Sequence, residues 1–427
     1  MDIHVVRAGE TVSSVAARYG VPAGILAGVN GVAPDAPLAV GQTLVVRRPR
    51  ELHAVASGES VYSIALRYGL SVRTLYQNNP ALGGRSALYP GQTLVIAYDD
   101  TPTRTLAVNA YSYPFIHGGL LDAALPYLTY LTPFTYGINA DGTLLPLADE
   151  WLLAAAGQYR TAALMHLSTL TEEGRFDNAR STLILEDADA QDALVQSILE
   201  TVQARHYFGL DVDFEYVLPE QREAYAAFIT RLREALNPLG CPVVVALAPK
   251  TSAAQRGLLY EAHDYALLGA AANAVFLMTY EWGYAYGPPM AVAPLGQVRA
   301  VLDYALTVVA PEKIFMGIPL YGYDWPLPFV SGETRAESLS PVQAVERALR
   351  HGIAIQYDAA AQAPYYHYTD RGGRKHTVWF EDARSIEAKL RLADEYHLQG
   401  VGYWNLTRPF PQNWAVLASL FDIETLL

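Results

Sequence analysis

The chain has 427 residues, of which 51% are apolar and 17% are charged, so it can bury a large core and is not intrinsically disordered. The formal net charge of −13, without any block of Lys or Arg, argues against a nucleic-acid partner and fits a neutral one such as a sugar polymer. The single cysteine, Cys241, excludes a disulfide framework within the chain.

The N-terminal sequence of residues 1–7 lacks a basic segment followed by an apolar one, so we expect no secretory signal. No uninterrupted apolar run reaches the length of a transmembrane helix, so we expect no membrane partner. No cluster of His, Cys and carboxylate residues has the spacing of metal ligands, and we expect neither a metal nor another cofactor.

The N-terminal part of the chain contains an internal repeat. Residues 9–10 (Gly-Glu) recur at 58–59, and residues 41–45 (Gly-Gln-Thr-Leu-Val) recur at 91–95. In each copy, apolar residues at helical spacing end at a glycine, and a second short helix and a closing strand follow. The sequence therefore predicts two small strand–helix–helix–strand units, at residues 1–48 and 51–97.

The repeat resembles the LysM module, because Gly-Glu-Thr or Gly-Glu-Ser precedes the first helix and Gly-Gln-Thr-Leu closes each unit. This resemblance implies binding to glycans that contain N-acetylglucosamine, such as peptidoglycan and chitin. The alternative is a generic packing repeat without a ligand.

A polar linker with a proline, residues 98–104, separates the repeats from a segment with a different pattern of apolar residues. In that segment, amphipathic helical runs, such as 191–205, 219–236 and 295–309, alternate with apolar strand-like runs. The strand-like runs begin near Leu106, Leu128, Ala162, Phe208, Pro242, Ala274, Ile314 and Gly400. Eight strands alternating with helices predict an α/β fold, a (β/α)8 TIM barrel, over residues 104–427.

The segment between the seventh and eighth predicted strands is too long for a single helix. It contains a predicted helix at 341–350 and short aromatic strands at 355–357, 365–368 and 377–380, with a turn at 371–374. We interpret residues from about 327 to 381 as a small α+β insertion that forms one wall of a cleft.

Residues 209–215 form the most informative strand. Its side chains alternate between an apolar face and an acidic face, which carries Asp211, Asp213 and Glu215. Three carboxylates are costly to bury, so such a strand either lies at a solvated edge or performs acid chemistry. As the fourth strand of a barrel it would turn the carboxylates inward and place Glu215 at the C-terminal mouth, where barrel enzymes act. This position favours catalysis.

Residues 208–215 are similar to the Asp-x-x-Asp-x-Asp-x-Glu signature of glycoside hydrolase family 18, with Phe208 in place of the first Asp. Residues 278–281, 317–322 and 402–405, at the ends of the sixth, seventh and eighth predicted strands, also agree with this family. Two further departures are Glu281, where the family has Asp, and residues 166–171 in place of Ser-x-Gly-Gly. With its two LysM units, the whole chain resembles the spore cortex-lytic N-acetylglucosaminidases and their spore-associated relatives.

The resemblance implies retaining hydrolysis in which the 2-acetamido group of the sugar is the nucleophile. It implies that Glu215 is the general acid and base, that Asp213 orients the acetamido group, that Asp211 shares a proton with Asp213, and that Tyr280 contacts the acetamido oxygen. It implies that Trp404 lies under the sugar. Further expected substrate contacts are Glu281, Tyr321, Trp282 and Trp325. We interpret His166 as a hydrogen-bonded core histidine.

Three functions are compatible with these features. The first is a glycosidase that cleaves β-1,4 linkages after N-acetylglucosamine in peptidoglycan of the spore cortex, with LysM modules as tethers. The second is a hydrolase of chitin or its oligomers, and the third is a non-catalytic glycan-binding protein of the spore coat. The resemblance implies a spore protein of the cortex or coat, with a cytoplasmic or cell-wall location as the alternative. The sequence leaves the oligomeric state open.

Overall fold

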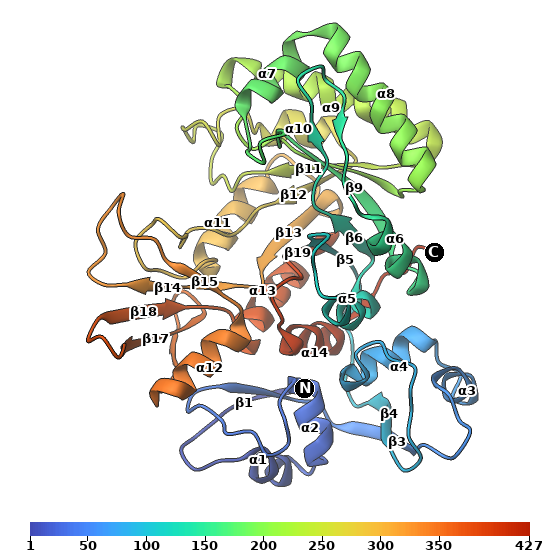
Figure 1. Ribbon diagram of the computed structural model, residues 1–427, viewed down its shortest axis with the longest axis vertical. Coiled ribbons are helices and arrows are strands. Elements are labelled where there is room, and N and C mark those ends of the chain that lie inside the picture. Colours follow the sequence, from blue (N-terminus) through green and yellow to red (C-terminus); the bar gives the residue numbers. More distant parts are fainter.

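The computed structural model describes residues 1–427. Its three parts are two small N-terminal modules, a barrel, and an insertion that projects from one side of the barrel (Figure 1). In this view the two modules lie side by side beneath the barrel.

Each module has the strand–helix–helix–strand order predicted from the repeat. The first contains β1 (Asp2–Val5), α1 (Val12–Tyr19), α2 (Ala23–Asn30) and β2 (Thr43–Val46), and the second contains β3 (Pro49–Ala54), α3 (Val61–Arg67), α4 (Val72–Asn78) and β4 (Thr93–Tyr98). The outer strands of each module pair antiparallel. Thr11 and Ser60 each form a capping box at the start of the first helix, which explains why both helices begin where the repeat places them.

The predicted barrel is confirmed. Its parallel strands are β5 (Arg104–Ser112), β6 (Tyr130–Pro133), β9 (Ala162–Ser168), β10 (Gly209–Asp213), β11 (Val243–Leu247), β12 (Ala274–Leu277), β13 (Ile314–Pro319) and β19 (Gly400–Trp404). Pairing of β19 with β5 closes the barrel. Two elements lie outside this ring: a hairpin of β7 (Gly137–Ile138) and β8 (Leu144–Leu145), and β20 (Phe421–Ile423), which pairs with the start of β5.

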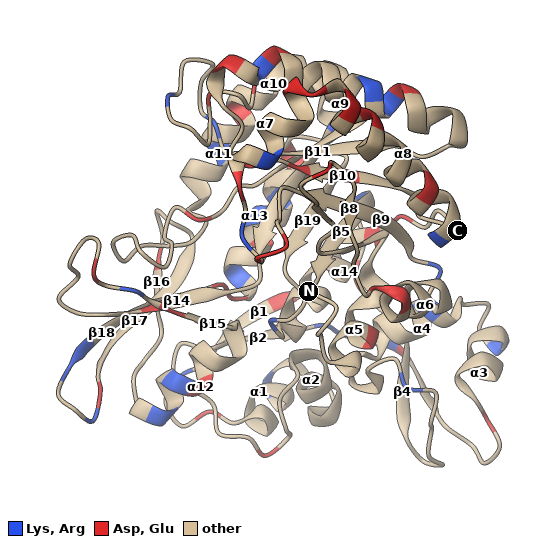
Figure 2. Ribbon diagram, turned by 45° about the horizontal axis from the view of Figure 1, so that its top comes forward, with Lys and Arg blue, Asp and Glu red and all other residues tan.

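Helices surround the strands. They are α5 (Gly118–Ala124), α6 (Glu150–Gln158), α7 (Asn178–Glu186), α8 (Ala188–Arg205), α9 (Arg222–Leu236), α10 (Tyr265–Ala271), α11 (Leu295–Ala305), α13 (Ala383–Glu395) and α14 (Pro411–Leu420). Acidic and basic residues are interspersed along outer helices such as α8 and α9 (Figure 2). No single helix is long and apolar enough to cross a membrane, and only α1 and α2 taken together as a bent pair reach that length.

The alternation of β10 divides its side chains between two cores. Leu210, Val212 and Phe214 are fully buried in the large core between the barrel and its helices. Phe214 stacks on Tyr225 of α9, with ring centroids 5.8 Å apart. A second, smaller core fills the barrel interior. The acidic face of β10 therefore points into the barrel, as the alternation predicts.

The insertion between β13 and β19 is a five-stranded antiparallel sheet with one helix. It contains β14 (Gly322–Pro326), β15 (Glu337–Leu339), α12 (Pro341–His351), β16 (Gln356–Asp358), β17 (Ala363–Thr369) and β18 (Lys375–Trp379). It begins earlier than residue 327, because β14 pairs with both β15 and β18 and so belongs to the inserted sheet.

Both modules pack on the barrel. Val45 of the first module and Val95 and Tyr98 of the second are part of the large core. In the second module, Arg73 donates to the carbonyl oxygens of Pro126 and Leu128 at 2.8 and 2.5 Å. The modules are therefore fixed to the barrel by apolar burial and hydrogen bonds.

Candidate active site

The acidic face of β10 leads to the open end of the barrel. Asp211 is fully buried, Asp213 is 6% exposed, and Glu215, two residues beyond, is half-buried at the mouth. The three side chains lie on the same face at successive depths, because alternate residues of a strand point the same way.

The two deeper carboxylates have few hydrogen-bond partners. One oxygen of Asp211 accepts a hydrogen bond of 2.6 Å from the hydroxyl of Tyr111, and its other oxygen has no partner. One oxygen of Asp213 also has no partner, and the other lies 3.7 Å from Nε2 of His166. Unpaired buried carboxylate oxygens favour the protonated form of the acid.

All three carboxyl groups have raised pKa values. Burial raises the pKa of Asp211 to about 7, opposed by the hydrogen bond from Tyr111. Burial raises the pKa of Asp213 well above its usual range, and the negative charges of Glu215 and Asp211 raise it further. Burial, together with the charge of Glu281, raises the pKa of Glu215. The group therefore holds at least one proton near neutral pH, as general acid catalysis requires.

Tyr280 lies beside these carboxylates at the end of β12. Burial raises the pKa of its hydroxyl well above 10, and the charges of Asp213 and Glu215 act in the same direction, so the phenol stays a hydrogen-bond donor. Gly317 on β13 makes room for the ring, because a Cβ atom at this position would lie 2.8 Å from a ring carbon of Tyr280. The glycine of the 317–322 motif thus positions the tyrosine of the 278–281 motif.

Trp404 lies at the end of β19 and lines the cleft. Three aromatic rings hold it edge-on: Phe134 at 4.8 Å, Tyr111 at 5.6 Å and Tyr113 at 5.9 Å between centroids. A half-buried indole fixed in this way presents a rigid apolar surface to the cleft.

Glu281 directs its carboxylate toward the insertion. Its Oε1 accepts hydrogen bonds from the hydroxyl of Tyr321 and from that of Tyr323, the latter at 3.0 Å. The backbone at Glu281 has φ of 68°, an unusual value for a non-glycine residue. The longer side chain that replaces the family's Asp therefore links the strand-six loop to the insertion.

The two other predicted tryptophans differ. Trp282 is half-buried and lines the cleft. Trp325 is fully buried in the insertion, and its indole N–H donates 2.8 Å to the carbonyl oxygen of Gly287. The prediction that Trp325 contacts sugar is therefore wrong: β14 turns this ring into a small core with Tyr323 instead of toward solvent.

Two residues of the site were not assigned a role in it from the sequence. Tyr111 is the hydrogen-bond donor to Asp211, and nothing in the sequence around it on the first strand indicates this contact. His166 is buried and its Nδ1 lies 2.6 Å from Oγ1 of Thr135, as expected of a hydrogen-bonded core histidine, but it also contacts Asp213. Burial lowers the pKa of His166 to about 3, so the ring is neutral.

Phe208 stands where the family has its first Asp. It packs in the barrel interior against Tyr130, with ring centroids 5.8 Å apart. Phe208 therefore offers Asp211 no hydrogen bond, and the hydrogen-bond partner of Asp211 is the Tyr111 phenol.

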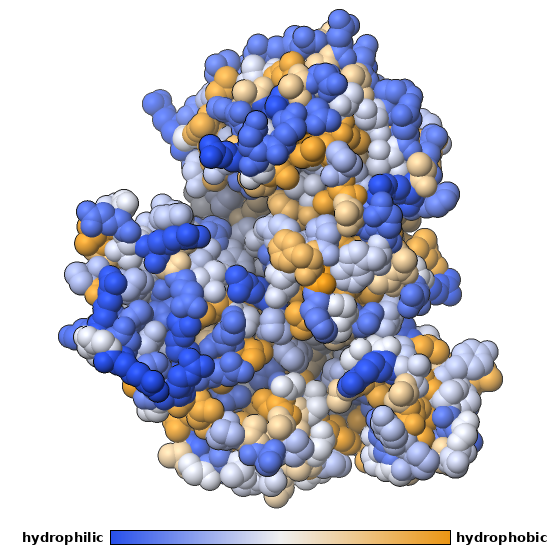
Figure 3. Space-filling view, in the orientation of Figure 1, coloured by the Kyte–Doolittle hydropathy of each residue, from blue (hydrophilic) through white to orange (hydrophobic).

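The site opens into a cleft of about 1190 Å3 between the barrel mouth and the insertion. Figure 3 shows the surface hollowed beside the insertion. Exposed aromatic residues line it, among them Phe115, Phe176, Tyr216 and Tyr284. No group of three or more His, Cys, Asp or Glu residues is arranged to hold a metal ion. A long cleft with aromatic walls suits an extended glycan.

Comparison with known proteins gives consistent results. Residues 171–408 match the model of glycosyl hydrolases family 18, and residues 4–47 and 53–97 match that of the LysM domain. The chain is 41% identical to the cortical fragment-lytic enzyme of Bacillus subtilis and 38% identical to that of Bacillus anthracis, over 99% of each chain.

Solved structures show the same relationship. The Bacillus cereus spore cortex-lytic enzyme SleL superimposes with a TM-score of 0.84 at 37% identity, over 99% of both chains. A chitinase from Chromobacterium violaceum superimposes with a TM-score of 0.68 at 25% identity, over 74% of this chain and 98% of that one.

Proposed function

The chain belongs to glycosyl hydrolases family 18 and carries two LysM domains, and we propose that it hydrolyses β-1,4 linkages after N-acetylglucosamine in spore cortex peptidoglycan. The observation that carries this proposal is the row of inward carboxylates on β10, ending in Glu215 at the mouth of a long cleft, in a chain related over its whole length to cortical fragment-lytic enzymes.

In the proposed first step, the acetamido oxygen of the sugar attacks its own anomeric carbon as the glycosidic bond breaks, and Glu215 gives its proton to the leaving oxygen. The raised pKa of Glu215 supports this role, because the acid must be protonated before reaction. In the second step, water attacks the anomeric carbon, Glu215 takes a proton from it, and the acetamido group is released with retained configuration.

We assign the other residues to support of the acetamido group. Asp213 would accept the acetamido N–H while sharing a proton with Asp211, and their raised pKa values are consistent with a shared proton. Tyr280 would donate to the acetamido oxygen as charge develops. Trp404 would lie under the sugar ring, and Trp282, Tyr321 and Glu281 would contact neighbouring parts of the substrate.

We further propose three functional units: LysM modules at 1–48 and 51–97 and a catalytic domain at 104–427 that includes the insertion. The modules would tether the enzyme to insoluble glycan and raise the local concentration of substrate. We place the protein in the spore, at the cortex or coat, on the basis of its cortex-lytic relatives.

A second candidate is hydrolysis of chitin or its oligomers, which the structural likeness to the Chromobacterium chitinase favours. One experiment separates the two candidates. The protein and its Glu215→Gln variant are incubated with cortical peptidoglycan and with chitin oligomers, and the released reducing ends are identified. Muropeptides from the unmodified protein alone support the cortex assignment, and release from chitin alone supports the second. Binding without any product would refute catalysis.

A further inference from the structure

The two modules contain the same turn before their closing strand. In the first, Ala39 N–H donates to Oε1 of Gln42 at 3.0 Å, and in the second Tyr89 N–H donates to Oε1 of Gln92 at 3.2 Å. The glycine between them donates its N–H, at 2.8 Å in both modules, to the equivalent valine carbonyl oxygen of the opening loop. The two turns therefore have one backbone geometry, and differences in their surroundings come from the rest of the protein.

The surroundings of the two turns are opposite. Ala39 is 3% exposed, in the apolar core of the insertion, whereas Tyr89 is 71% exposed. The carbonyl oxygen of Val40 accepts a hydrogen bond of 2.8 Å from the N–H of Ile355. A Cβ atom at Gly41 would lie 2.0 Å from the carbonyl oxygen of Ile355, whereas one at Gly91 would have no neighbour within 4 Å. The first turn is docked on the insertion, and the second is free.

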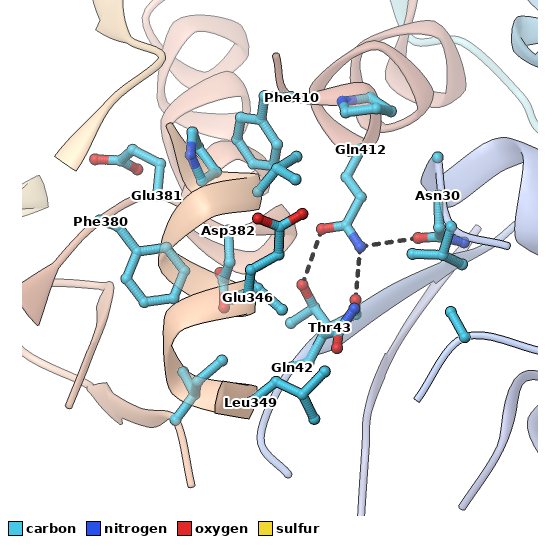
Figure 4. Close-up of a pocket in the computed structure, with 18 of the residues that line it drawn as sticks. Asn30, Gln42, Thr43, Glu346, Leu349, Phe380, Glu381, Asp382, Phe410 and Gln412 are labelled. Atoms are coloured by element: carbon cyan, nitrogen blue, oxygen red, sulfur yellow. Dashed lines mark hydrogen bonds between the residues drawn. The ribbon is translucent and has the colours of Figure 1, made fainter. Parts of the chain in front are cut away.

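The first module is also fastened to the barrel. The side-chain amide of Gln412, on α14, donates to Oδ1 of Asn30 at 2.9 Å and to the carbonyl oxygen of Thr43 at 2.6 Å, and its oxygen accepts from the Thr43 hydroxyl (Figure 4). A cavity of about 280 Å3 remains between this module, α12 and α14. The first module thus bridges the barrel and the insertion, the wall of the catalytic cleft.

The second module instead exposes large side chains on α3 and on the turn before β4. Tyr62, Leu66 and Tyr89 are 68%, 68% and 71% exposed, and the first module has Ser13, Ala17 and Ala39 at the equivalent positions. Tyr62 and Leu66 lie one turn apart on the outer face of α3. Adjacent exposed apolar side chains such as Tyr62 and Leu66 are typical of interaction surfaces, and tyrosine rings suit the apolar faces of an uncharged sugar.

From these differences we propose that the two repeats have separate tasks. The first module is a scaffold that holds the insertion wall against the barrel and does not bind glycan through its turn. The second module presents the glycan-binding surface, with Tyr62, Leu66 and Tyr89 as its contacts. This inference rests on the proposed binding of glycan by the LysM modules, and it assigns that binding to the second module.

The test uses the full-length Glu215→Gln protein, which should bind without cleaving, and insoluble cortical peptidoglycan and chitin beads as probes. The triple variant Tyr62→Ser, Leu66→Ala, Tyr89→Ala gives the second module the residues of the first. Affinity for the beads is expected to fall at least about tenfold with an unchanged melting temperature. Unchanged affinity of the triple variant would overturn the proposal.

Two variants of the first module serve as matched controls. Val40→Ala, at a side chain that is 40% exposed, is expected to change affinity less than about twofold. Gly41→Ala is expected to lower the melting temperature, because its Cβ collides with Ile355, while affinity stays within about twofold. Two results would contradict the division. One is a loss of affinity in Val40→Ala that equals the loss in the triple variant. The other is a higher affinity of Gly41→Ala without a lower melting temperature.

A failure of the proposed catalytic function can be distinguished from a failure of the proposed division of binding. In the background with Glu215 intact, the triple variant should cleave short soluble oligomers at the rate of the unmodified protein. If neither protein cleaves any glycan, the proposed catalysis fails while the bead measurements still decide how binding is divided.

Discussion

The hydroxyl of Tyr111 donates a hydrogen bond of 2.6 Å to Asp211, the deepest carboxylate of the site. Phe208, which packs against Tyr130 in the barrel interior, cannot supply a hydrogen bond, and the phenol is the hydrogen-bond donor that holds Asp211. Since a donor stabilises the ionised form, Tyr111 keeps the pKa of Asp211 lower than burial alone would set it. In the proposed mechanism, the pair would therefore adjust how readily Asp211 exchanges a proton with Asp213.

Replacement of Tyr111 by Phe is expected to raise the pKa of Asp211 above its value of about 7. We expect an apparent pKa in the pH profile of kcat/KM to move upward by about one unit, the size of one lost hydrogen bond. The profile is measured on N-acetylglucosamine oligomers. A profile identical to that of the unmodified protein would show that Tyr111 does not tune the carboxylates.

The raised pKa of Asp211 also predicts how stability depends on pH. Between about pH 4 and 7 the folded protein binds a proton at Asp211 that the unfolded chain has lost, so stability falls as pH rises through this window. The Asp211→Asn variant is uncharged throughout, and its melting temperature should fall less from pH 4 to pH 8. An equal fall in both proteins would contradict this assignment.

Burial raises the pKa of Glu215, and the charge of Glu281 raises it further. The Glu281→Gln variant should therefore lower that pKa and move the alkaline limb of the kcat/KM profile to lower pH, because Glu215 loses its proton earlier. Glu234→Gln, at an exposed position on α9, removes one charge far from the site and is expected to leave the profile in place. If both variants shift the limb equally, net charge and not Glu281 is responsible.

Trp404 and Trp325 allow a paired test of cleft and core. Trp404→Ala is expected to lower kcat/KM on oligomers about 10²-fold by removal of the stacking surface, with modest loss of stability. Trp325→Ala should lower the free energy of unfolding by about 3–5 kcal/mol, because the ring is fully buried. Its kcat/KM, measured well below its melting temperature, should change little. A loss as large as that of Trp404→Ala would indicate that Trp325 contributes to substrate binding in the cleft.

Lys389 of α13 and Glu381, which precedes this helix, form a buried ion pair of 2.8 Å, and both side chains are 1% exposed. Lys389→Met leaves Glu381 buried and unpaired, so we expect a loss of about 3–5 kcal/mol in the free energy of unfolding. The double variant Lys389→Met, Glu381→Leu removes both charges and should recover most of this loss. Denaturant titration measures the free energy of unfolding of both variants. If the double variant recovers none of the loss, packing rather than charge causes it.

Local patterns were sufficient for most of the fold. The repeat of residues 9–45 in 58–95 predicted both modules, and the strand starts from Leu106 to Gly400 predicted the barrel, because each depends on periodicity along the chain. The alternation of β10 likewise predicted that Asp211 and Asp213 point inward. The start of the insertion was placed too late, since β14 is recognisable only through its pairing with β15 and β18.

The modules, the barrel and the inward row of carboxylates follow from local sequence patterns, since helix and strand periods are properties of neighbouring residues. The contacts between residues from different strands depend on the tertiary structure. It placed Tyr111 against Asp211, His166 against Asp213 and Trp325 in a core, and it docked one of two equivalent turns on the insertion while it left the other in solvent. Such contacts depend on the closure of the barrel and on the direction of distant side chains, which no local pattern encodes.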